Sequence, residues 1–449
     1  MRKKTFKYFR SAPDMQPIED AKAVGSLYRY WRLRTFYAMY IGYIFYYFTR
    51  KSFTFIMPVL QEGGMSLASL GMISSALSLS YGCSKFFSGI LGDRSNPRYF
   101  MAIGLLFTGA CNLAFGLSSS LLLFVIFWGL NGWFQGWGWP GCAKLLTYWY
   151  SHKERGLWWG LWNTSHNLGG ALAPLLVGLV MHHFDWRTCL FVSAFLSLLG
   201  SLFLLNRLRD TPRSLGLPPV EVYQGEAQAP KEERESYPAR KILLRFVLKN
   251  PCIWILSWAN FFVYVIRTAV NDWSFLYYCQ HFPGEGYSVA SLCCCSFEVG
   301  GLVGSLSAGW LSDSLFLGRR NPINVLYLTG TMTLCFCMVY MPSDAPFALH
   351  ALWMFAMGFC IFGPQMLIGM AAAELSHKKA VASASGFTGF WGYLGAAFAG
   401  LPLGGLIAQW GWSGYFAFLS FTALLAGGAL LPLWHAQEHL ETGAQDAPI

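Results

Sequence analysis

Two arginines lie inside apolar and aromatic stretches of this chain, where a charged side chain has little access to water. Arg50 stands in YIFYYFTRKSF, and Arg267 stands 217 residues later in NFFVYVIRTAVNDW. Each follows a tyrosine, Tyr47 or Tyr264, by three residues, and such a pair shares one face of a helix. Guanidinium groups present paired N–H donors that match the oxygens of a phosphate or a carboxylate. Two such groups predict a binding site for an anion, with the phosphate dianion as the natural ligand.

The alternative for either arginine is structural: the side chain reaches the membrane interface or pairs with an acid. An arginine at mid-membrane costs about 2.5 to 3.5 kcal/mol, so it is normally retained for a function and faces an aqueous cavity. Asp272 and Glu298 are the acids nearest in sequence to Arg267; they either hold a counter-charge while the site is empty or pair structurally. Lys51 lies about 100° round the helix from Arg50, which favours a structural or interfacial role for the lysine.

Three further polar side chains in apolar stretches are candidates for the same site. Lys85, in YGCSKFFSG, either reaches the interface as an ordinary lysine or makes an accessory contact with the anion. His166, in WGLWNTSHNLGG, can titrate near neutral pH and respond to the second ionisation of a phosphate near pH 6. A hydrogen-bonded structural histidine is the other interpretation. Asn163 lies three residues before His166 on the same helix face, which favours a polar site.

The composition places the chain in a membrane. Hydrophobic residues make up 55% of the 449 residues and charged residues only 12%, whereas soluble domains carry about 25% charged residues. Apolar stretches long enough to cross a hydrocarbon core of about 30 Å recur along the chain. We predict an all-α membrane protein with twelve transmembrane helices, at residues 36–57, 70–91, 99–117, 121–145, 157–182, 188–206, 252–275, 288–312, 323–341, 347–371, 381–407 and 412–434.

Sequence patterns recur at a nearly constant offset, which predicts two related halves. GILGDRSNPR, residues 89–98, is repeated as GWLSDSLFLGRRNP, residues 309–322. Two parallel six-helix halves with a substrate bound between them at mid-depth describe the major facilitator fold. The predicted domains are a cytoplasmic N-terminal segment (1–35), an N-terminal six-helix bundle (36–206), a cytoplasmic linker rich in proline and charge (207–250), a C-terminal six-helix bundle (251–434) and a cytoplasmic tail (435–449).

The positive charges predict the topology rather than a nucleic-acid partner, although the formal net charge is +10. Lysines and arginines are concentrated before the first stretch, between the two halves and in alternate short connections. On the opposite side only Arg187 appears, in HHFDWR. The positive-inside rule therefore puts both termini in the cytoplasm. We expect a multi-pass protein of a bacterial inner membrane, without a cleavable signal because the first 35 residues are polar and charged.

No pattern for catalysis, a cofactor or a metal rises above background. The twelve cysteines contain no CxxC pair, and we expect them to be small packing residues. GWFQGWGWPGC lacks the GK[ST] ending of a phosphate-binding loop, so its glycines predict close packing of helices. Asp93 and Arg94, in the GDRSNPR turn, are expected to lock neighbouring helices or to take part in gating. We therefore predict a protein that is not an enzyme and has no cofactor and no metal site.

Several stretches together resemble the organophosphate:inorganic phosphate antiporter family of the major facilitator superfamily. The matching strings are YYFTRKSF, YGCSKFFSGILGDRSNPR, GWFQGWGWPGC, SHKERG, WNTSHNLGG, FVYVIRTAVNDWS and GFTGFWGYLG. The similarity runs through nearly all twelve predicted spans. Within that family the chain is most similar to bacterial hexose-phosphate transporters and their sensor relatives, with glycerol-3-phosphate transporters close behind.

The resemblance implies which residues form the site. Arg50 and Arg267 correspond to the family's phosphate-binding pair, His166 to its pocket histidine, and Glu298 to an acid thought to pair near the site. The positions implied for the pocket or the pathway are Tyr43, Tyr47, Lys85, Trp139, Asn163, Tyr264 and Tyr393. Two departures leave the organic part of the substrate open. Phe362 stands where some glycerol-phosphate members have a tyrosine, and residues 381–407 contain no charged residue, whereas some hexose-phosphate carriers have an acid and a lysine there.

The implied function is the exchange of a sugar phosphate, with glucose 6-phosphate the first candidate, for inorganic phosphate. We expect a monomer in which rocking of the two halves exposes the site alternately to each side of the membrane. Without an anion, closing would bring two cations together in a low dielectric, so the empty carrier should return slowly. The alternatives are a sensor of the same fold that binds the sugar phosphate without transporting it, and a glycerol 3-phosphate:phosphate antiporter.

Overall fold

The computed structural model describes residues 10–225, 244, 247–282, 286–342, 345–376 and 381–436. Within these ranges the regular elements are helices, as predicted, and the one β-bridge is isolated, between Arg10 and Ser95. The predicted N-terminal segment, linker and C-terminal tail lie partly outside the described residues, at 1–9, 226–243, 245–246 and 437–449.

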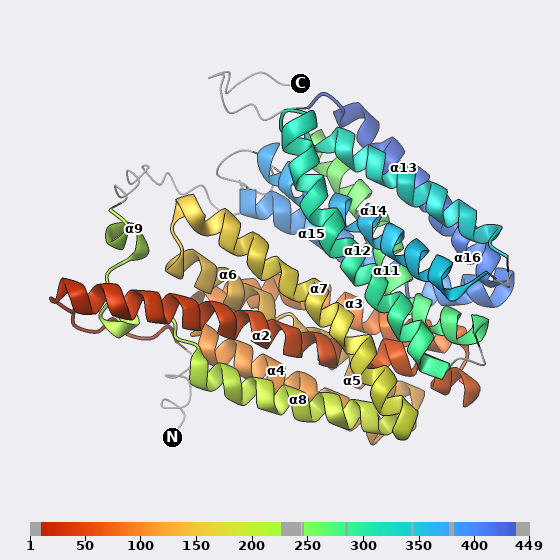
Figure 1. Cartoon of the computed structure of the whole chain (residues 1–449), viewed down its shortest axis with the longest axis horizontal. Helices are drawn as coiled ribbons and strands as arrows, with labels where there is room; N and C mark the ends of the chain where they lie inside the picture. The colour runs from red at the N-terminus through yellow and green to blue at the C-terminus, as the bar shows by residue number, and fades with distance from the viewer. Residues whose placement is uncertain are drawn as a thin grey trace. The chain divides into compact units, whose positions relative to one another are not determined.

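The helices occur in two runs, which Figure 1 shows coloured by residue number. The first run is α2 (Ala21–Glu62), α3 (Leu67–Arg94), α4 (Pro97–Gly116), α5 (Leu121–Gln135), α6 (Gly138–Trp149), α7 (His152–His183) and α8 (Trp186–Arg207), followed by the short η1 (Arg213–Leu215) and α9 (Val220–Tyr223). The second run is α11 (Pro251–His281), α12 (Gly286–Leu315), α13 (Arg320–Val339), α14 (Phe347–Glu374), α15 (Val381–Phe398), α16 (Leu401–Leu430) and η4 (Leu431–Leu433).

This order is consistent with twelve spans. Eight described stretches are long and apolar enough to cross a membrane, and one of them, Ser383–Leu433, covers nearly all of the last two predicted spans. The fourth predicted span, 121–145, is divided between α5 and α6, which are 15 and 12 residues long. Those two lengths are each too short to cross a membrane singly, so together they form one span.

The eleventh predicted span, 381–407, is not one helix. It breaks after Phe398, and α16 begins at Leu401 with a proline in its first turn. A proline lacks the backbone donor that a continuous helix needs, so it fits at a helix start. Inside α16, Gly411 has a φ of 65°, a left-handed conformation that glycine adopts without strain. This turn falls between the predicted ends at 407 and 412.

The described residues form two compact units. Unit 1 lies within Met1–Glu235 and Tyr278–Cys295, and unit 2 lies within Ser236–Tyr277 and Ser296–Ile449. The segment 278–295 belongs to unit 1 because its side chains bond to helices there: Gln280 donates to the Gln61 side chain (2.7 Å), and Ser291 donates to the Pro174 carbonyl (3.0 Å). The predicted boundaries at 206 and 251 stay a prediction.

In unit 1, α2 packs along α7 and α8, while α4 runs beside α8 and α3 beside α5 (Figure 1). A glycine allows α3 and α5 to approach: a Cβ on Gly132 would lie 2.3 Å from the Leu77 carbonyl oxygen. Large aromatic side chains fill the space around α2, including Tyr43, Tyr46 and Trp162, each at most 1% exposed. The core of unit 1 is therefore aromatic around the helix that carries Arg50.

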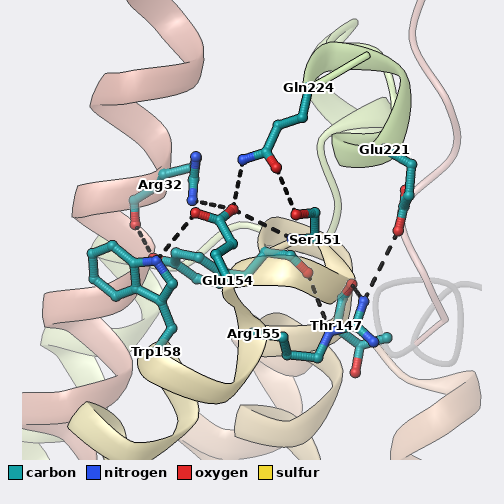
Figure 2. A network of polar contacts seen from close by, with 9 residues as sticks. Arg32, Thr147, Ser151, Glu154, Arg155, Trp158, Glu221 and Gln224 are labelled. Carbon is teal, nitrogen blue, oxygen red and sulfur yellow. Dashed lines mark hydrogen bonds and ion pairs between the residues drawn. The ribbon is translucent and has the colours of Figure 1, made fainter. Parts of the chain in front are cut away.

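One end of unit 1 is covered by residues 10–35 and 208–225, which we call the cap. Figure 2 shows part of it, where Glu154 at the start of α7 pairs with Arg32 of α2 and accepts a hydrogen bond from Gln224 (2.7 Å). Gln224 also accepts a hydrogen bond from Ser151 (Figure 2). The Tyr223 ring stacks on Tyr28 with centroids 4.0 Å apart. These contacts hold the first part of the linker, residues 208–225, against α2 and α7.

In unit 2, α13 packs along both α14 and α16. Near the start of α13, Arg320 forms ion pairs with Asp313 of α12 and with Glu374 of α14, the second at 3.1 Å. Asp313 and Arg320 lie in the second copy of the repeated sequence, residues 309–322, whereas Asp93 and Arg94 lie in the first copy, residues 89–98. The pairing of Arg320 joins three helices at one end of unit 2.

Candidate functional site

Arg50 points from α2 at side chains of two neighbouring helices of unit 1. Its guanidinium carbon lies 5.0 Å from the centre of the Tyr47 ring and 4.6 Å from that of Tyr81, on α3. Both distances are within the range of a cation–π interaction. Its Nε donates to Oε1 of Gln135, on α5, at 3.3 Å. The tyrosine three residues before Arg50 therefore shares its face, as the spacing predicts.

Gln135 is fixed by a buried polar network. The side chain is fully buried, and its amide nitrogen donates to the Tyr46 carbonyl (3.1 Å) and to the Thr49 hydroxyl (3.0 Å). Asn131, one turn earlier, donates to the Thr49 carbonyl (2.9 Å). Because buried polar groups must be satisfied, these bonds direct the acceptor oxygen of Gln135 towards Arg50.

Sequence reasoning missed Gln135 and Tyr81 as neighbours of Arg50. A signal for Gln135 existed, because it is a polar side chain in the apolar fourth span. Tyr81 carried no comparable signal, since aromatic residues make up 17% of the chain.

His166, on α7, lies among three aromatic rings. Its ring centre is 4.5 Å from that of Tyr43, 4.9 Å from that of Trp162 and 5.9 Å from that of Tyr47. Nδ1 lies 2.9 Å from the Asn163 carbonyl oxygen. A carbonyl only accepts, so Nδ1 carries a proton, and in the neutral ring Nε2 is the accepting nitrogen. The structure thus brings His166 together with two of the predicted pocket tyrosines.

Lys85, on α3, faces the start of α6. Its ammonium nitrogen lies 4.9 Å from the centre of the Trp139 ring, and that ring in turn contacts Trp159 of α7, with centroids 5.9 Å apart. The two residues predicted for the pocket or pathway therefore contact each other. Lys85 is half-buried.

In unit 2, Arg267 lies against two rings. Its guanidinium carbon is 4.8 Å from the centre of the Phe362 ring, on α14, and 6.0 Å from that of Tyr264, one turn earlier on α11. Tyr264 meets Tyr393 of α15 edge to face, with centroids 5.6 Å apart. The predicted residues Arg267, Tyr264 and Tyr393 therefore form one group, and Phe362, expected to affect the organic part of the substrate, contacts the arginine itself.

The acids of unit 2 are placed differently from each other. Glu298 is 3% exposed, and it accepts a hydrogen bond from the Asn271 side chain at 2.8 Å. Asn271 follows Arg267 by four residues on α11, so Glu298 lies near the helix face that carries the arginine. Asp272 is the next residue of α11 and is half-buried. The side chains of Asp93 and Arg94, predicted to gate or lock helices, lie outside the described residues.

The described parts of the chain contain no group of three His, Cys, Asp or Glu side chains that would hold a metal ion. All twelve cysteines lie in described segments, and no disulfide joins them. Each unit offers one guanidinium with aromatic rings beside it. Hydroxyl and amide groups lie near both arginines, and unit 1 adds the imidazole of His166. A phosphate suits the guanidinium, and the polar face of a sugar suits the hydroxyl and amide groups.

Comparisons with known proteins agree with this chemistry. The chain matches the model of the Major Facilitator Superfamily over residues 39–400. A "Probable hexose phosphate transport protein" of Chlamydia pneumoniae is 50% identical over 446 residues, which cover 96% of this chain and 97% of the relative. The "Membrane sensor protein UhpC" of Escherichia coli is 44% identical over 433 residues, covering 96% and 98%.

A third relative and one solved structure extend the comparison. The "Hexose-6-phosphate:phosphate antiporter" of Escherichia coli is 35% identical over 413 residues, covering 87% of this chain and 88% of the relative. A crystal structure of a bacterial homolog of the human lysosomal transporter Spinster, inward-facing and occupied, superposes with a TM-score of 0.70 at 14% identity, covering 89% of this chain and 96% of the other. This likeness shows a common fold.

Proposed function

The chain belongs to the Major Facilitator Superfamily and, within it, to the organophosphate:inorganic phosphate antiporter family, and we propose that it exchanges glucose 6-phosphate for inorganic phosphate. It is a sugar phosphate transporter and not an enzyme. The choice of glucose 6-phosphate rests on relatives whose names specify hexose phosphates. The observation that carries the proposal is the repeated group of one arginine and one tyrosine, Arg50 with Tyr47 and Arg267 with Tyr264.

The phosphate group is the part of the substrate that the two arginines bind in this proposal. A phosphate dianion accepts hydrogen bonds on three oxygens, and each guanidinium can donate two parallel ones. The ring beside each guanidinium limits the orientations of its plane. The same two side chains bind inorganic phosphate, since it presents the same oxygens. Competition of the two ligands for one site is the basis of exchange.

Electrostatic repulsion between the two arginines couples the movement of sugar phosphate to that of inorganic phosphate. When the site closes, water leaves, and two cations in a low dielectric repel each other more strongly than in water. A bound phosphate removes this repulsion, so the loaded carrier reorients and the empty one does not. In alternating access, each crossing of the membrane therefore requires an anion. The gradient of inorganic phosphate drives uptake of the sugar phosphate without ATP.

The remaining predicted residues contact the sugar or line its path. Aromatic rings and hydroxyls at Tyr43, Tyr47, Tyr264 and Tyr393 present both an apolar face and a hydrogen-bonding group. The other members of this proposed pocket are Lys85, Trp139, Asn163 and His166. Glu298 and Asp272 either offset part of the Arg267 charge in the empty site, which leaves a net repulsion between the arginines on closing, or pair structurally. Asp93 and Arg94 act in gating.

We further propose a bacterial inner-membrane protein with both termini in the cytoplasm, acting as a monomer within the bilayer. The distribution of lysine and arginine supports this orientation, because positive segments remain on the cytoplasmic side. The proposed halves for the rocking motion are residues 36–206 and 251–434, with the linker 207–250 between them.

A sensor that binds the sugar phosphate without transport is the second candidate function. The 44% identity to a membrane sensor protein favours it, and a sensor needs the same two arginines as a carrier. A glycerol 3-phosphate:phosphate antiporter is a third candidate, because the same phosphate chemistry serves a smaller organic group.

Transport of labelled glucose 6-phosphate by purified protein in liposomes separates these candidates. For the antiporter, uptake should occur only when inorganic phosphate is trapped inside the vesicles, and unlabelled glycerol 3-phosphate should compete weakly. Binding of the sugar phosphate without uptake in either kind of vesicle would refute transport and favour the sensor. Stronger competition by glycerol 3-phosphate than by glucose 6-phosphate would reassign the substrate.

A further inference from the structure

A cavity of about 280 Å³ lies at the end of unit 1 where α8 ends and α4 begins. The cap closes it on one side with residues 10–13 and on another with residues 209, 210, 214 and 215. Asn96, Arg98 and Tyr99, at the start of α4, form the remaining wall. None of these residues takes part in the proposed transport site.

Three arginines and one acid line this cavity. The acid, Asp210, is 2% exposed, and its charge is already countered: Oδ1 lies 3.1 Å from Nζ of Lys144, and Oδ2 accepts a hydrogen bond from the Ala12 amide at 2.8 Å. The arginines are Arg10, Arg98 and Arg209. Among the described residues, none of the three arginines forms an ion pair with an acid.

Backbone and aromatic groups fix two of these arginines without neutralising them. Arg98 donates through Nε to the Leu205 carbonyl, near the end of α8. Arg209 donates to the Leu208 carbonyl (2.7 Å) and lies over the Trp31 ring, 5.0 Å from its centre. Arg34 lies over the same ring at 4.8 Å. Positive side chains are therefore gathered around one tryptophan and one cavity wall.

Burial and the neighbouring arginines both act on the pKa of Arg209. Burial lowers the pKa of Arg209 below its ordinary value, and repulsion from Arg98 and Arg34 lowers it further. An arginine remains charged at neutral pH in any case. An anion in the cavity would relieve this repulsion.

The start of α4 adds to the positive potential. This 20-residue helix begins at Pro97, and its N-cap residue Asn96 accepts a hydrogen bond from the Arg98 amide. The partial positive charge of a helix N-terminus favours an anion. Ser11 also lines the cavity. Its hydroxyl accepts from Lys144 at 2.8 Å, so its own proton can be donated to a phosphate oxygen.

We propose that this cavity binds the phosphate group of an anionic phospholipid headgroup or a free phosphate ion, at a site separate from the transport site. α8 ends at the cavity and exposes Leu202 (55% exposed), and α2 exposes Leu33 (62% exposed). Leu33 precedes Arg34, whose guanidinium lies over the same Trp31 ring as Arg209. A lipid can thus place its chains along these side chains while its phosphate reaches the arginines.

Thermal unfolding of full-length protein tests the proposal. Every arm uses the Arg267→Gln background, so that phosphate binding at the proposed transport site does not contribute. The probes are phosphatidylglycerol, phosphatidylcholine at the same concentration, and inorganic phosphate alone. Phosphatidylglycerol should raise Tm by at least about 2 °C more than phosphatidylcholine does, and native mass spectrometry should show the lipid retained on the protein.

The added variants are Arg209→Gln and Arg10→Gln, with Arg29→Gln as the matched control. Arg29 is exposed on α2, and its Nε donates to the Gly25 carbonyl of its own helix. The first two variants should lose at least half of the Tm shift, and the control should keep it. Arg98→Gln gives a further test, but its bond to Leu205 also supports folding. Arg10 makes no hydrogen bond among the described residues beyond its backbone bridge, so its loss should leave the fold intact.

A shift with phosphatidylglycerol and none with inorganic phosphate would identify a lipid headgroup site. A comparable shift with inorganic phosphate alone would identify a site for the free ion. Both results support an anion site at these arginines. Equal shifts in Tm with and without the cavity substitutions Arg209→Gln and Arg10→Gln would overturn the proposal. The absence of a Tm shift with either phosphatidylglycerol or inorganic phosphate would also overturn it.

Discussion

The two arginines stand in different surroundings, although the sequence repeats them. Arg50 lies between two tyrosine rings and donates to Gln135. Arg267 lies against one tyrosine ring and one phenylalanine ring. Gln135 belongs to the fourth predicted span and Phe362 to the tenth, which are corresponding spans of the two halves. A hydrogen-bonding side chain in one half is thus matched by an apolar ring in the other.

The two environments orient the guanidinium groups in different ways. A hydrogen bond from Nε to a fixed acceptor determines both the plane and the direction of the guanidinium of Arg50. The ring faces of Tyr264 and Phe362 restrict the plane of the Arg267 guanidinium. We therefore expect Gln135 to orient Arg50 before the anion binds, and the Phe362 ring to restrict the plane of Arg267.

Removal of either arginine should reduce phosphate exchange more than any other substitution considered. Arg50→Gln and Arg267→Gln each delete a charge and two donors to phosphate. Hydrogen bonds to charged groups contribute about 1.5 to 3 kcal/mol each, so exchange of inorganic phosphate in liposomes should fall at least about a hundredfold in both variants. Substantial exchange by one of them would show that only the other unit binds the phosphate.

Loss of the hydrogen bond between Arg50 and Gln135 should weaken phosphate binding less than the loss of an arginine does. Gln135→Met keeps the volume but removes the acceptor of Arg50, so the KM for inorganic phosphate should rise about tenfold, the equivalent of one hydrogen bond to a charged group. The same change removes donors to Tyr46 and Thr49, and Tm should fall. A normal KM with a lowered Tm would mean that Gln135 supports the fold and not the orientation of Arg50.

Substitutions at Phe362 should change the KM for phosphate less than Gln135→Met does. The size of the change should depend on whether the new side chain keeps an aromatic ring. Phe362→Leu removes the ring face under Arg267, a cation–π interaction worth about 0.5 to 1 kcal/mol, so the KM for phosphate should rise about two- to fivefold. Phe362→Tyr is the matched control, because it keeps the ring and should leave this KM unchanged. If both variants behave alike, the ring face does not orient Arg267.

The Glu154 contacts of the cap should matter least for phosphate exchange. Glu154→Gln breaks a partly exposed ion pair with Arg32, and such pairs contribute about 0 to 1 kcal/mol. Tm should fall by no more than a few degrees, and the KM for phosphate should not change. An altered KM for phosphate would show that the cap influences the proposed transport site.

The helical fold, the number of spans and the repeat were predictable because they depend on apolar length and on local patterns. The tyrosines beside the arginines were predictable for the same reason, since a spacing of three residues determines a shared face. The contacts of Arg50 with Gln135 and Tyr81, and of Arg267 with Phe362, were not. They depend on how separate helices pack, and neither composition nor spacing determines which side chains meet across an interface. The break at residues 399–400 and the cavity at the start of α4 also depend on packing and cap contacts between distant segments.

Exchange of radiolabelled inorganic phosphate for unlabelled phosphate in liposomes is the most direct test of phosphate binding by Arg50 and Arg267, because it requires only the part that the two substrates share. The proteins compared are the wild type, Arg50→Gln, Arg267→Gln and the control Arg29→Gln, which removes an equal charge outside the site. We predict rapid exchange by the wild type and by Arg29→Gln and almost none by Arg50→Gln and Arg267→Gln. Exchange at the wild-type rate in either arginine variant would contradict the claim that the two residues bind the phosphate together.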